Sequence, residues 1–378
     1  MNKISLFLVP LAILLLSSPV LASDTAKSMA MGGAVVAIGD DLSAPYINPA
    51  GLANMKKTFG GLSMTSNSIS WGGDADASGS RTNLFEHLGG ATPLGTGAIY
   101  AGTAANNWSF ADIDNPGVGS DVIVDTWLNT PGVAYGLEVM PGLKVGGGLN
   151  YLMRSTTSKQ PDTDDELSFS GTGIGAVLGA LYSATPTVNV GGSVTLLGDV
   201  ISSGKLEMPS GDLDIDRTNN SLPSTLRLGV AVKPMPDLTV SGQFDLVTAV
   251  NFEQEFATEE GSSVMEIRTD GVVVTRLGVE YLVAQGKVPL WAGVSFTPGN
   301  NCEITAMDSG GIAEWAMFST GGYIIPNSTT ISVGAGYNEE IYSLGIALSS
   351  TSGTFSIPAA DEITISETKV LVSGTIRI

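Results

Sequence analysis

The chain has 378 residues, of which 48 are glycine and only 14% are charged, and its formal net charge is −20. Phosphate contacts require clustered Lys and Arg, so this charge excludes a nucleic-acid partner. One His and one Cys exclude a histidine metal cluster and an internal disulfide, and we expect no bound metal or other cofactor.

The first 22 residues have the pattern of a secretion signal. Lys3 supplies a positive charge, an apolar run follows from Ile4 to Leu16, and the stretch ends in Val20-Leu21-Ala22. The apolar run is too short to span a bilayer as a helix. We therefore expect residues 1–22 to be removed on export. The residue directly after the cleavage point is Ser23 and not Cys, so we expect no lipid anchor.

Residues 23–56 form an irregular, glycine-rich lead that includes "MAMGGAVVAIGDDLSAPYINPAGLAN" at 29–54. Its glycines permit tight backbone turns. Pro45 and Pro49 prevent a continuous helix or sheet. The stretch is compatible only with short pieces of regular structure.

From residue 57 onward, long stretches alternate between apolar and polar residues. The clearest lies near 238–250, where Thr239, Ser241, Gln243 and Asp245 oppose an apolar face of Leu238, Val240, Gly242, Phe244, Leu246 and Val250. Period-two patterning predicts β-strands with one apolar and one polar face. Many of these strands are a dozen residues long, which suits a tilted membrane strand of about 9–11 residues better than a soluble sandwich.

Pro, Gly and charged residues mark the connections between these strands. Short turns are expected at 92–95, 140–142, 184–186, 233–237, 284–287 and 337–340, and longer loops at 72–80, 111–121, 157–165, 205–220, 257–263, 299–327 and 357–360. These connections join 14 strands, an even number, with both ends of the barrel sequence on one side. The sequence therefore predicts an all-β fold: a 14-stranded antiparallel transmembrane β-barrel over residues 57–378.

Aromatic residues give an independent indication of two membrane surfaces. Trp71, Trp108, Phe110, Trp127, Phe169, Phe252 and Phe296 fall near predicted loop ends, whereas Tyr182, Tyr281, Tyr337 and Tyr342 fall near predicted turn ends. Amphipathic rings gather at the two interfaces of membrane barrels.

A barrel of this size is too wide for its own side chains to fill. By strand parity, the charged residues that point into the lumen are Arg154, Asp199, Arg227, Asp245, Arg276 and Glu280. They are candidates to contact a plug or a ligand head group, or to pair with one another and keep the lumen rigid. We expect residues 23–56 to fill the lumen as a plug, with Asp40, Asp41 and Asn48 facing the inward arginines.

The lead and the barrel together resemble the FadL/TodX family of outer-membrane transporters for hydrophobic compounds. The likeness rests on the acidic pair Asp40-Asp41 and the element Asn48-Pro49-Ala50-Gly51 in the lead. It continues in barrel stretches such as "LRLGVAVKPMPDLTVSGQFD". The resemblance implies that residues 23–56 are a hatch, with Asn48, Pro49 and Ala50 touching the barrel wall. It also implies that apolar ligands such as long-chain fatty acids or aromatic hydrocarbons pass without an energy source and leave sideways through a kink in the wall.

The sequence departs from the family in its external loops and its last residue. The stretches 157–165 and 205–220 are too modest for the family's large docking loops, and Ile378 replaces the usual C-terminal aromatic residue. The longest loop, 299–327, contains Trp315 and Phe318 and serves either as a substitute capture surface or as a lid. Strand glycines at 146–148 and 191–192 either permit a wall kink or let strands pack closely on the plug.

The leading interpretation is a passive transporter of hydrophobic small molecules in the bacterial outer membrane, in contact with its lipid and lipopolysaccharide. The alternative is a barrel that does not transport but docks a partner of a secretion or envelope system. An outer-membrane hydrolase would need His87 as its base, and no serine lies nearby in register. We therefore predict that the chain is not an enzyme.

Overall fold

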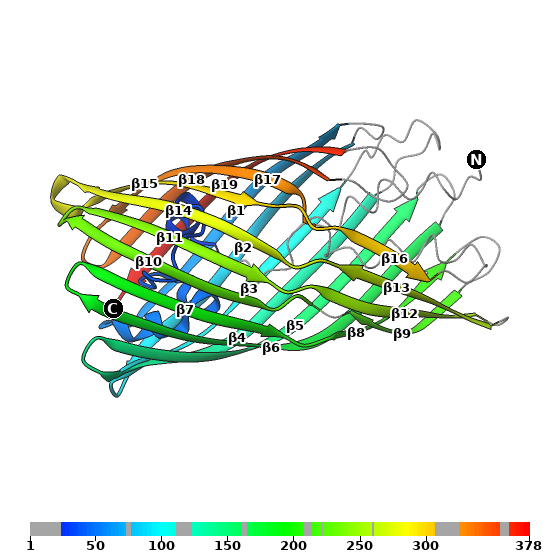
Figure 1. Cartoon of the computed structure of the whole chain (residues 1–378), viewed down its shortest axis with the longest axis horizontal. Helices are drawn as coiled ribbons and strands as arrows, with labels where there is room; N and C mark the ends of the chain where they lie inside the picture. Colours follow the sequence, from blue (N-terminus) through cyan, green and yellow to red (C-terminus); the bar gives the residue numbers. More distant parts are fainter. Residues whose placement is uncertain are drawn as a thin grey trace.

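The structure is a computed structural model that describes residues 24–72, 77–110, 123–160, 165–207, 213–220, 222–258, 261–306, 325–355 and 363–378. These residues form one antiparallel sheet closed into a barrel (Figure 1). Its strand segments are β1 (Phe59–Gly72), β2 (Ala77–Leu94), β3 (Gly97–Phe110), β4 (Ile123–Met140), β5 (Leu143–Gln160), β6 (Asp165–Thr185), β7 (Val188–Leu197), β8 (Val200–Glu207), β9 (Leu213–Asn220), β10 (Thr225–Met235), β11 (Leu238–Val247), β12 (Val250–Thr258), β13 (Gly261–Thr269), β14 (Val272–Val283), β15 (Val288–Thr297), β16 (Cys302–Ala306), β17 (Asn327–Asn338), β18 (Tyr342–Phe355) and β19 (Ile363–Arg377).

Five neighbouring barrel strands are each interrupted once, so these segments make up 14 strands. The broken strands are β7/β8, β9/β10, β11/β12, β13/β14 and β15/β16. Beyond the breaks, β8, β9, β12, β13 and β16 pair with one another and extend the wall toward the long-loop end (Figure 1). On this side of the barrel, the breaks therefore separate the part of the wall near the short turns from an extension at the long-loop end.

The barrel closes where its first and last strands meet. β1 pairs with β19 over its whole length, from Phe59 opposite Arg377 to Gly72 opposite Thr364. The predicted 14-stranded antiparallel barrel is confirmed. Within the described ranges, no helix is long and apolar enough to cross a membrane.

The two faces of β11 follow the predicted alternation. Phe244 is 54% exposed on the outside, whereas Gln243 and Asp245 are buried inside at 2% and 4%. An apolar outer face and a polar inner face suit a wall with lipid on one side. Val250 was expected on the outer face but is only 5% exposed. Val250 lies beyond the break that follows Val247, and the alternation of inward and outward side chains does not continue across that break.

The connections also follow the prediction, but several strands run further than expected. All six predicted short turns lie at one end of the barrel, where the C-terminus also lies (Figure 1). β9 occupies part of the stretch 205–220 that was expected to be a loop. Tyr182 and Tyr281 are exposed near the short turns as expected, whereas Phe169, expected at a membrane surface, is buried at 9%.

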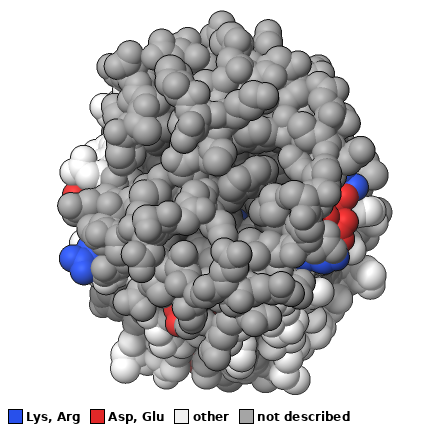
Figure 2. Space-filling view, turned by 90° about the vertical axis from the view of Figure 1, so that its right-hand side faces the viewer, with Lys and Arg blue, Asp and Glu red and all other residues white. Residues whose placement is uncertain are grey.

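Figure 2 views the opposite, long-loop end. The described residues form the rim of this view, where basic and acidic side chains lie beside one another. Two exposed ion pairs at this end are Lys159 with Glu166 at 2.8 Å and Lys205 with Glu207 at 3.1 Å. Such exposed pairs contribute little to stability.

The residues before β1 lie inside the barrel, near the short turns (Figure 1). They form α2 (Ala26–Ala30), α3 (Ala44–Ile47) and the 3-10 helix η2 (Pro49–Asn54). Thr25 and Ser28 form a capping box that starts α2. α2 contacts β15, β17, β18 and β19, and η2 contacts β3, β4, β5 and β6, so this N-terminal segment spans the lumen.

Candidate functional site

The N-terminal segment rests directly on strand backbone, at positions where the barrel wall has glycine. A Cβ atom at any of these glycines would lie less than 3.0 Å from the segment, closer than real Cβ contacts allow. The glycines are Gly61, Gly136, Gly146, Gly179, Gly191, Gly229, Gly278, Gly293, Gly334 and Gly345, each on a different strand. We call these ten residues the glycine seats.

The seats decide between the two roles considered for the strand glycines at 146–148 and 191–192. At Gly146 a Cβ would lie 2.3 Å from Pro49, and at Gly191 it would lie 2.3 Å from the carbonyl oxygen of Val36. Gly147 and Gly192 instead have Leu178 and Leu228 as their nearest neighbours. Close packing on the N-terminal segment therefore accounts for Gly146 and Gly191.

Asn48 links two stretches of the N-terminal segment to each other and to the barrel wall. Its Oδ1 accepts a hydrogen bond from the Ala50 N–H at 3.2 Å and so caps η2. Its Nδ2 donates to the carbonyl oxygen of Val36 at 2.7 Å and to that of Ala180 in β6 at 3.0 Å. With Asn48 only 1% exposed, each of its polar atoms has a partner.

Gly51, the last residue of the Asn-Pro-Ala-Gly element, packs against another glycine. A Cβ on Gly51 would lie 2.3 Å from the carbonyl oxygen of Gly39, which itself has a left-handed φ of +54°. Pro49 begins η2, where a missing N–H costs nothing, and Ala50 is fully buried. The element thus folds the segment back on the Gly39 turn.

Asp40 and Asp41 have their partners within the N-terminal segment and not at the inward arginines, where we expected them. Asp40 forms an ion pair with Lys27 at 2.9 Å, within the N-terminal segment itself. Asp41 accepts hydrogen bonds from the hydroxyl of Thr25 and from the N–H and hydroxyl of Ser43. The expectation failed because strand parity predicts which wall residues point inward but not which residues of the segment they meet.

The same local contacts shift the pKa values of Asp41 and Lys27. Burial raises the pKa of Asp41, and the neighbouring charge of Asp40 raises it further. Burial lowers the pKa of Lys27, but Asp40 and Glu280 outweigh it, so the net pKa lies above the ordinary value.

Three inward polar side chains of β11 and β14 hold the segment from the wall. Arg276 donates to the carbonyl oxygen of Gly32 at 3.1 Å and forms an ion pair with Asp245 at 2.7 Å. Gln243 accepts from the Val36 N–H at 2.9 Å. Glu280 pairs with Lys27 at 3.0 Å. Both interpretations of the lumen charges therefore apply, since they bind the segment and also bind one another.

A further buried connection joins the segment to β2. Lys369 of β19 contacts Asp24 at 3.0 Å and Glu86 of β2 at 2.8 Å. The side chain of Glu86 is fully buried. Sequence reasoning missed Glu86 because it lies in an irregular part of β2, where the alternation is interrupted.

That irregularity is the main departure from regular pairing between β2 and β3. The register of β2 against β1 shifts between Ser63 and Thr65, and its register against β3 shifts between Ser80 and His87. A membrane-spanning wall must satisfy its backbone polar groups internally, so an interruption of the ladder is costly and marks a special site.

His87, the residue that a hydrolase would need as base, is packed in an aromatic cluster. Its Nε2 lies 3.0 Å from the hydroxyl of Tyr100, and its ring meets Tyr46 edge-on at 5.7 Å between centroids. Tyr46 belongs to α3 and donates to the carbonyl oxygen of Thr130 at 3.1 Å. His87 thus helps to hold the N-terminal segment.

Apolar side chains also face the lumen, between the N-terminal segment and the long-loop end. Val247, Val272 and Val274 are 8%, 6% and 5% exposed and pack together with Ile325. A second group contains Leu152, Val177 and Val200, all buried at 1% or less, and also includes Leu42, Tyr46 and Leu52 of the N-terminal segment. The lumen therefore combines the polar contacts that hold the segment with apolar side chains packed against it and beyond it.

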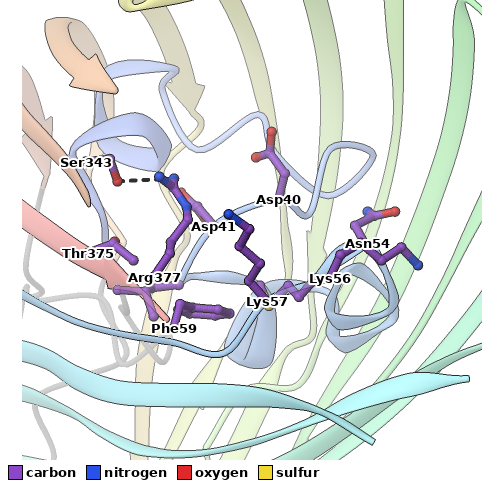
Figure 3. A pocket seen from close by; sticks show the side chains of 11 residues that line it. Asp40, Asp41, Asn54, Lys56, Lys57, Phe59, Ser343, Thr375 and Arg377 are labelled. Carbon is purple, nitrogen blue, oxygen red and sulfur yellow. Dashed lines mark hydrogen bonds between the residues drawn. The ribbon is translucent and has the colours of Figure 1, made fainter. Parts of the chain in front are cut away.

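A pocket of about 380 Å³ lies at the short-turn end, between the N-terminal segment and the ends of β1, β18 and β19 (Figure 3). Arg377 lines it and donates to the hydroxyl of Ser343 at 3.3 Å. Lys57 also lines it and forms an exposed ion pair with Glu340 at 3.2 Å. Asp40 and Asp41 of the N-terminal segment also line it (Figure 3).

The remaining predicted site residues lie apart from these contacts or outside the described residues. Arg154 follows Leu152 on the inner face of β5 and is half-buried. Asp199 lies in the break between β7 and β8 and is exposed, so strand parity does not predict its direction. Trp315 and Phe318 fall outside the described residues.

The comparisons with known proteins concern the fold. No protein-family model and no curated protein matches the chain. The structure is similar to the toluene transporter TodX of Pseudomonas putida, with a TM-score of 0.71 over 95% of this chain and 99% of TodX at 15% identity. It is also similar to the toluene transporter TbuX of Ralstonia pickettii (0.65, 95% and 99%, 15% identity) and to a FadL homologue of Pseudomonas aeruginosa (0.63, 93% and 96%, 13% identity). At these identities the likeness establishes the fold.

Proposed function

We propose that the chain is an outer-membrane barrel through which small hydrophobic molecules pass without an energy source. The observation that carries this proposal is the group of inward valines, Val247, Val272 and Val274, which pack with Ile325 inside the barrel. A water-filled pore has a polar interior. Aliphatic side chains on the lumen side instead favour a solute that leaves water, at about 25 cal/mol per Å² of apolar surface buried.

Residues 23–56 act as the hatch of this barrel in our proposal. The glycine seats, the Asn48 contacts and the Lys27–Glu280 pair support this role, because they hold a folded segment across the lumen. A barrel closed in this way holds a hydrophobic solute in its lumen and blocks the free flow of ions. The exposed aliphatic outer faces of its strands favour a position in lipid.

The register shift between β2 and β3 is the best candidate for the sideways exit that the family resemblance implies. It is a local departure from regular pairing, and Glu86 beside it is linked through Lys369 to Asp24 of the hatch. A molecule that leaves there would enter the membrane rather than water.

The fold likeness gives this proposal its second support. TodX and TbuX are toluene transporters by name, and this chain spans nearly their whole length. The test is uptake of a hydrophobic probe such as toluene into liposomes that contain the purified barrel. We expect saturable uptake, with a loss in Val272→Asn, whose side chain faces inward, and none in Val273→Ala, whose side chain is 48% exposed on the outside.

Uptake by the wild-type barrel no faster than by empty liposomes would contradict the proposal. Recovery of a stoichiometric protein partner together with that result would support the docking role instead.

A further inference from the structure

The extension at the long-loop end contains one weakly paired seam, between β9 and β12. β8 pairs with β9 along most of its length, and β12 pairs with β13 along its whole length. Between β9 and β12, which lie side by side (Figure 1), the described residues form a single pair, Gln254 opposite Thr218. The wall is therefore held together less firmly here than on either side.

The seam has a closed foot. At the break below it, the Thr248 N–H donates to the carbonyl oxygen of Ser224 at 2.9 Å, and the Ser224 N–H donates to the hydroxyl of Thr248 at 2.9 Å. Between this foot and Gln254, no further pair joins the two strands in the described part of the chain. The regular antiparallel ladder is missing along this stretch. A stretch with few cross-strand bonds opens at a lower free energy than its well-paired neighbours.

Apolar side chains lie on the outer surface just below the foot of the seam. Leu226, Leu246 and Val273 occupy one row across β10, β11 and β14. They are 40%, 40% and 48% exposed. They belong to the apolar outer face that suits lipid. A hydrophobic molecule dissolved in the membrane can therefore reach the foot of the seam.

Apolar side chains also lie on the inner surface at this level. Val247 and Val272, each next to a residue of the outer row, lie opposite one another and belong to the inward apolar group. Val250, the first residue of β12, is buried beyond the break. On the other flank, Leu222 packs against the group that contains Val200. The wall is thus apolar on both of its surfaces where its ladder is interrupted.

We propose that the seam between β9 and β12 is a side entrance, through which a small apolar molecule passes from the outer part of the membrane to Val247 and Val272. This inference rests on the proposed function and adds the route by which its ligand enters. A molecule that takes this route moves from one apolar surface to another and does not have to dissolve in water between them. The seam lies at the long-loop end, which faces outward in barrels of this kind.

The first test locks the seam with a disulfide. Thr218→Cys and Gln254→Cys are combined with Cys302→Ser, which removes the single native cysteine. Opposed residues of an antiparallel pair have Cα atoms about 4.5–5.5 Å apart, within the span of a disulfide. In cells whose outer membrane contains the full-length barrel, we expect the oxidised lock to slow toluene uptake by about tenfold or more, which corresponds to about 1.4 kcal/mol against opening. Reduction with dithiothreitol should restore the uptake.

A second pair of cysteines controls for the disulfide itself. On its other side, Gln254 lies opposite Met265 in the regular ladder of β12 and β13. Gln254→Cys with Met265→Cys, also in Cys302→Ser, makes the same crosslink where the strands are already paired. Its toluene uptake should equal that of Cys302→Ser alone, both oxidised and reduced.

Two substitutions on the outer face of β10 test the route without a disulfide. Leu226→Asn adds a polar side chain at the foot of the seam. Val230→Asn makes the corresponding change nearer the short turns, at a residue that is 42% exposed. We expect slower uptake in Leu226→Asn and unchanged uptake in Val230→Asn, because only Leu226 borders the seam.

Hydrogen exchange of the wild-type barrel tests the seam apart from transport. In an antiparallel strand, alternate residues direct their backbone groups to opposite neighbours. We expect the N–H groups of β12 that face β9 to exchange faster than those that face β13. Equal protection of both sets would overturn the inference, since the seam would then be no weaker than the ladder beside it.

Unchanged uptake in the oxidised lock, or an equal loss in the control pair, would also overturn the side entrance. Either result would leave the proposed function standing, because toluene would still enter through the barrel. If wild-type cells take up toluene no faster than cells without the barrel, the proposed function itself fails and the side entrance fails with it.

Discussion

The side-chain amide of Asn48 donates a hydrogen bond to the carbonyl oxygen of Ala180 in β6 at 3.0 Å, which joins the N-terminal segment to the barrel wall. The same amide nitrogen reaches the carbonyl oxygen of Val36 at 2.7 Å. One side chain therefore holds two stretches of the segment and one strand in a single arrangement.

Asn48→Ala should loosen the segment while the barrel stays folded. The substitution removes the η2 cap and leaves the buried carbonyl groups of Val36 and Ala180 without this donor, at a cost of about 2–4 kcal/mol in local opening. Hydrogen exchange should rise in residues 24–58 and not in the strands. Asn48→Asp keeps the capping oxygen but places a buried carboxylate oxygen against two carbonyl oxygens, so it should loosen the segment at least as much as Asn48→Ala at neutral pH. Wild-type protection in Asn48→Ala would show that the contact has no role in seating.

Gly146→Ala should displace the segment, whereas Gly147→Ala should not. A Cβ at Gly146 would lie 2.3 Å from Pro49, but at Gly147 its nearest neighbour is the flexible tip of Leu178 at 3.3 Å. Overpacking of this kind costs about 1–3 kcal/mol. Ion conductance of the barrel in planar bilayers measures the displacement, and we expect a rise only in Gly146→Ala. Equal conductance of the two variants would argue against a seat at this strand.

The folded N-terminal segment should become less stable as pH rises, because Asp41 loses its proton. Burial and the charge of Asp40 raise the pKa of Asp41 in the folded segment above its ordinary value. Its contribution to stability is therefore fully present below the unfolded pKa of about 3.9 and is lost as pH rises through the folded value. Lys27, Thr25 and Ser43 also face the group and oppose the shift.

Exchange protection of residues 24–58, measured from about pH 4 to about pH 8, tests this effect. Protection should fall with rising pH in the wild type and change less in Asp41→Asn, which carries no charge at any pH. A steeper pH dependence in Asp41→Asn than in the wild type would reverse the sign of this prediction.

Lys369→Met should destabilise both the segment and the β2 irregularity. Lys369 is the cation between Asp24 and the fully buried Glu86, and removal of one partner of a buried pair costs about 3–5 kcal/mol. Glu86→Gln should recover part of the loss when it is combined with Lys369→Met, because the fully buried charge of Glu86 is then removed and only the partly exposed Asp24 lacks its lysine. Thermal unfolding of the two single variants and the double variant measures this coupling. Purely additive effects would mean that the pair is not coupled.

Much of the barrel was predictable because lipid and lumen impose opposite requirements on alternate residues. The faces of β11 and the short turn at Pro141-Gly142 followed directly from period-two patterning and turn chemistry. The five strand breaks were not predictable. A break such as the one between Val247 and Val250 leaves no fixed signature, and it shifts the face of every residue after it.

The contacts of the N-terminal segment were harder to predict than its presence. Pro45, Pro49 and the glycines indicated a compact fold, and the resemblance implied a hatch. The partners of Asp40, Asp41 and Glu86 depend on how an irregular chain meets a curved wall, and no local period specifies that. Arg227, Asp245 and Arg276 were predicted to point inward by parity, but only the structure shows that Asp245 pairs with Arg276 rather than with Arg227.

The glycine seats change what the amino-acid composition of a barrel can reveal. An empty or water-filled barrel tolerates small side chains anywhere on its inner wall, and natural variation would scatter them. A barrel that encloses part of its own chain needs glycine, which has no side chain, wherever a strand meets that segment. This wall has such a glycine in ten strands. Glycines aligned across successive strands near the short turns are therefore a sequence fingerprint of an occupied lumen, open to search in barrels for which only the amino-acid sequence is known.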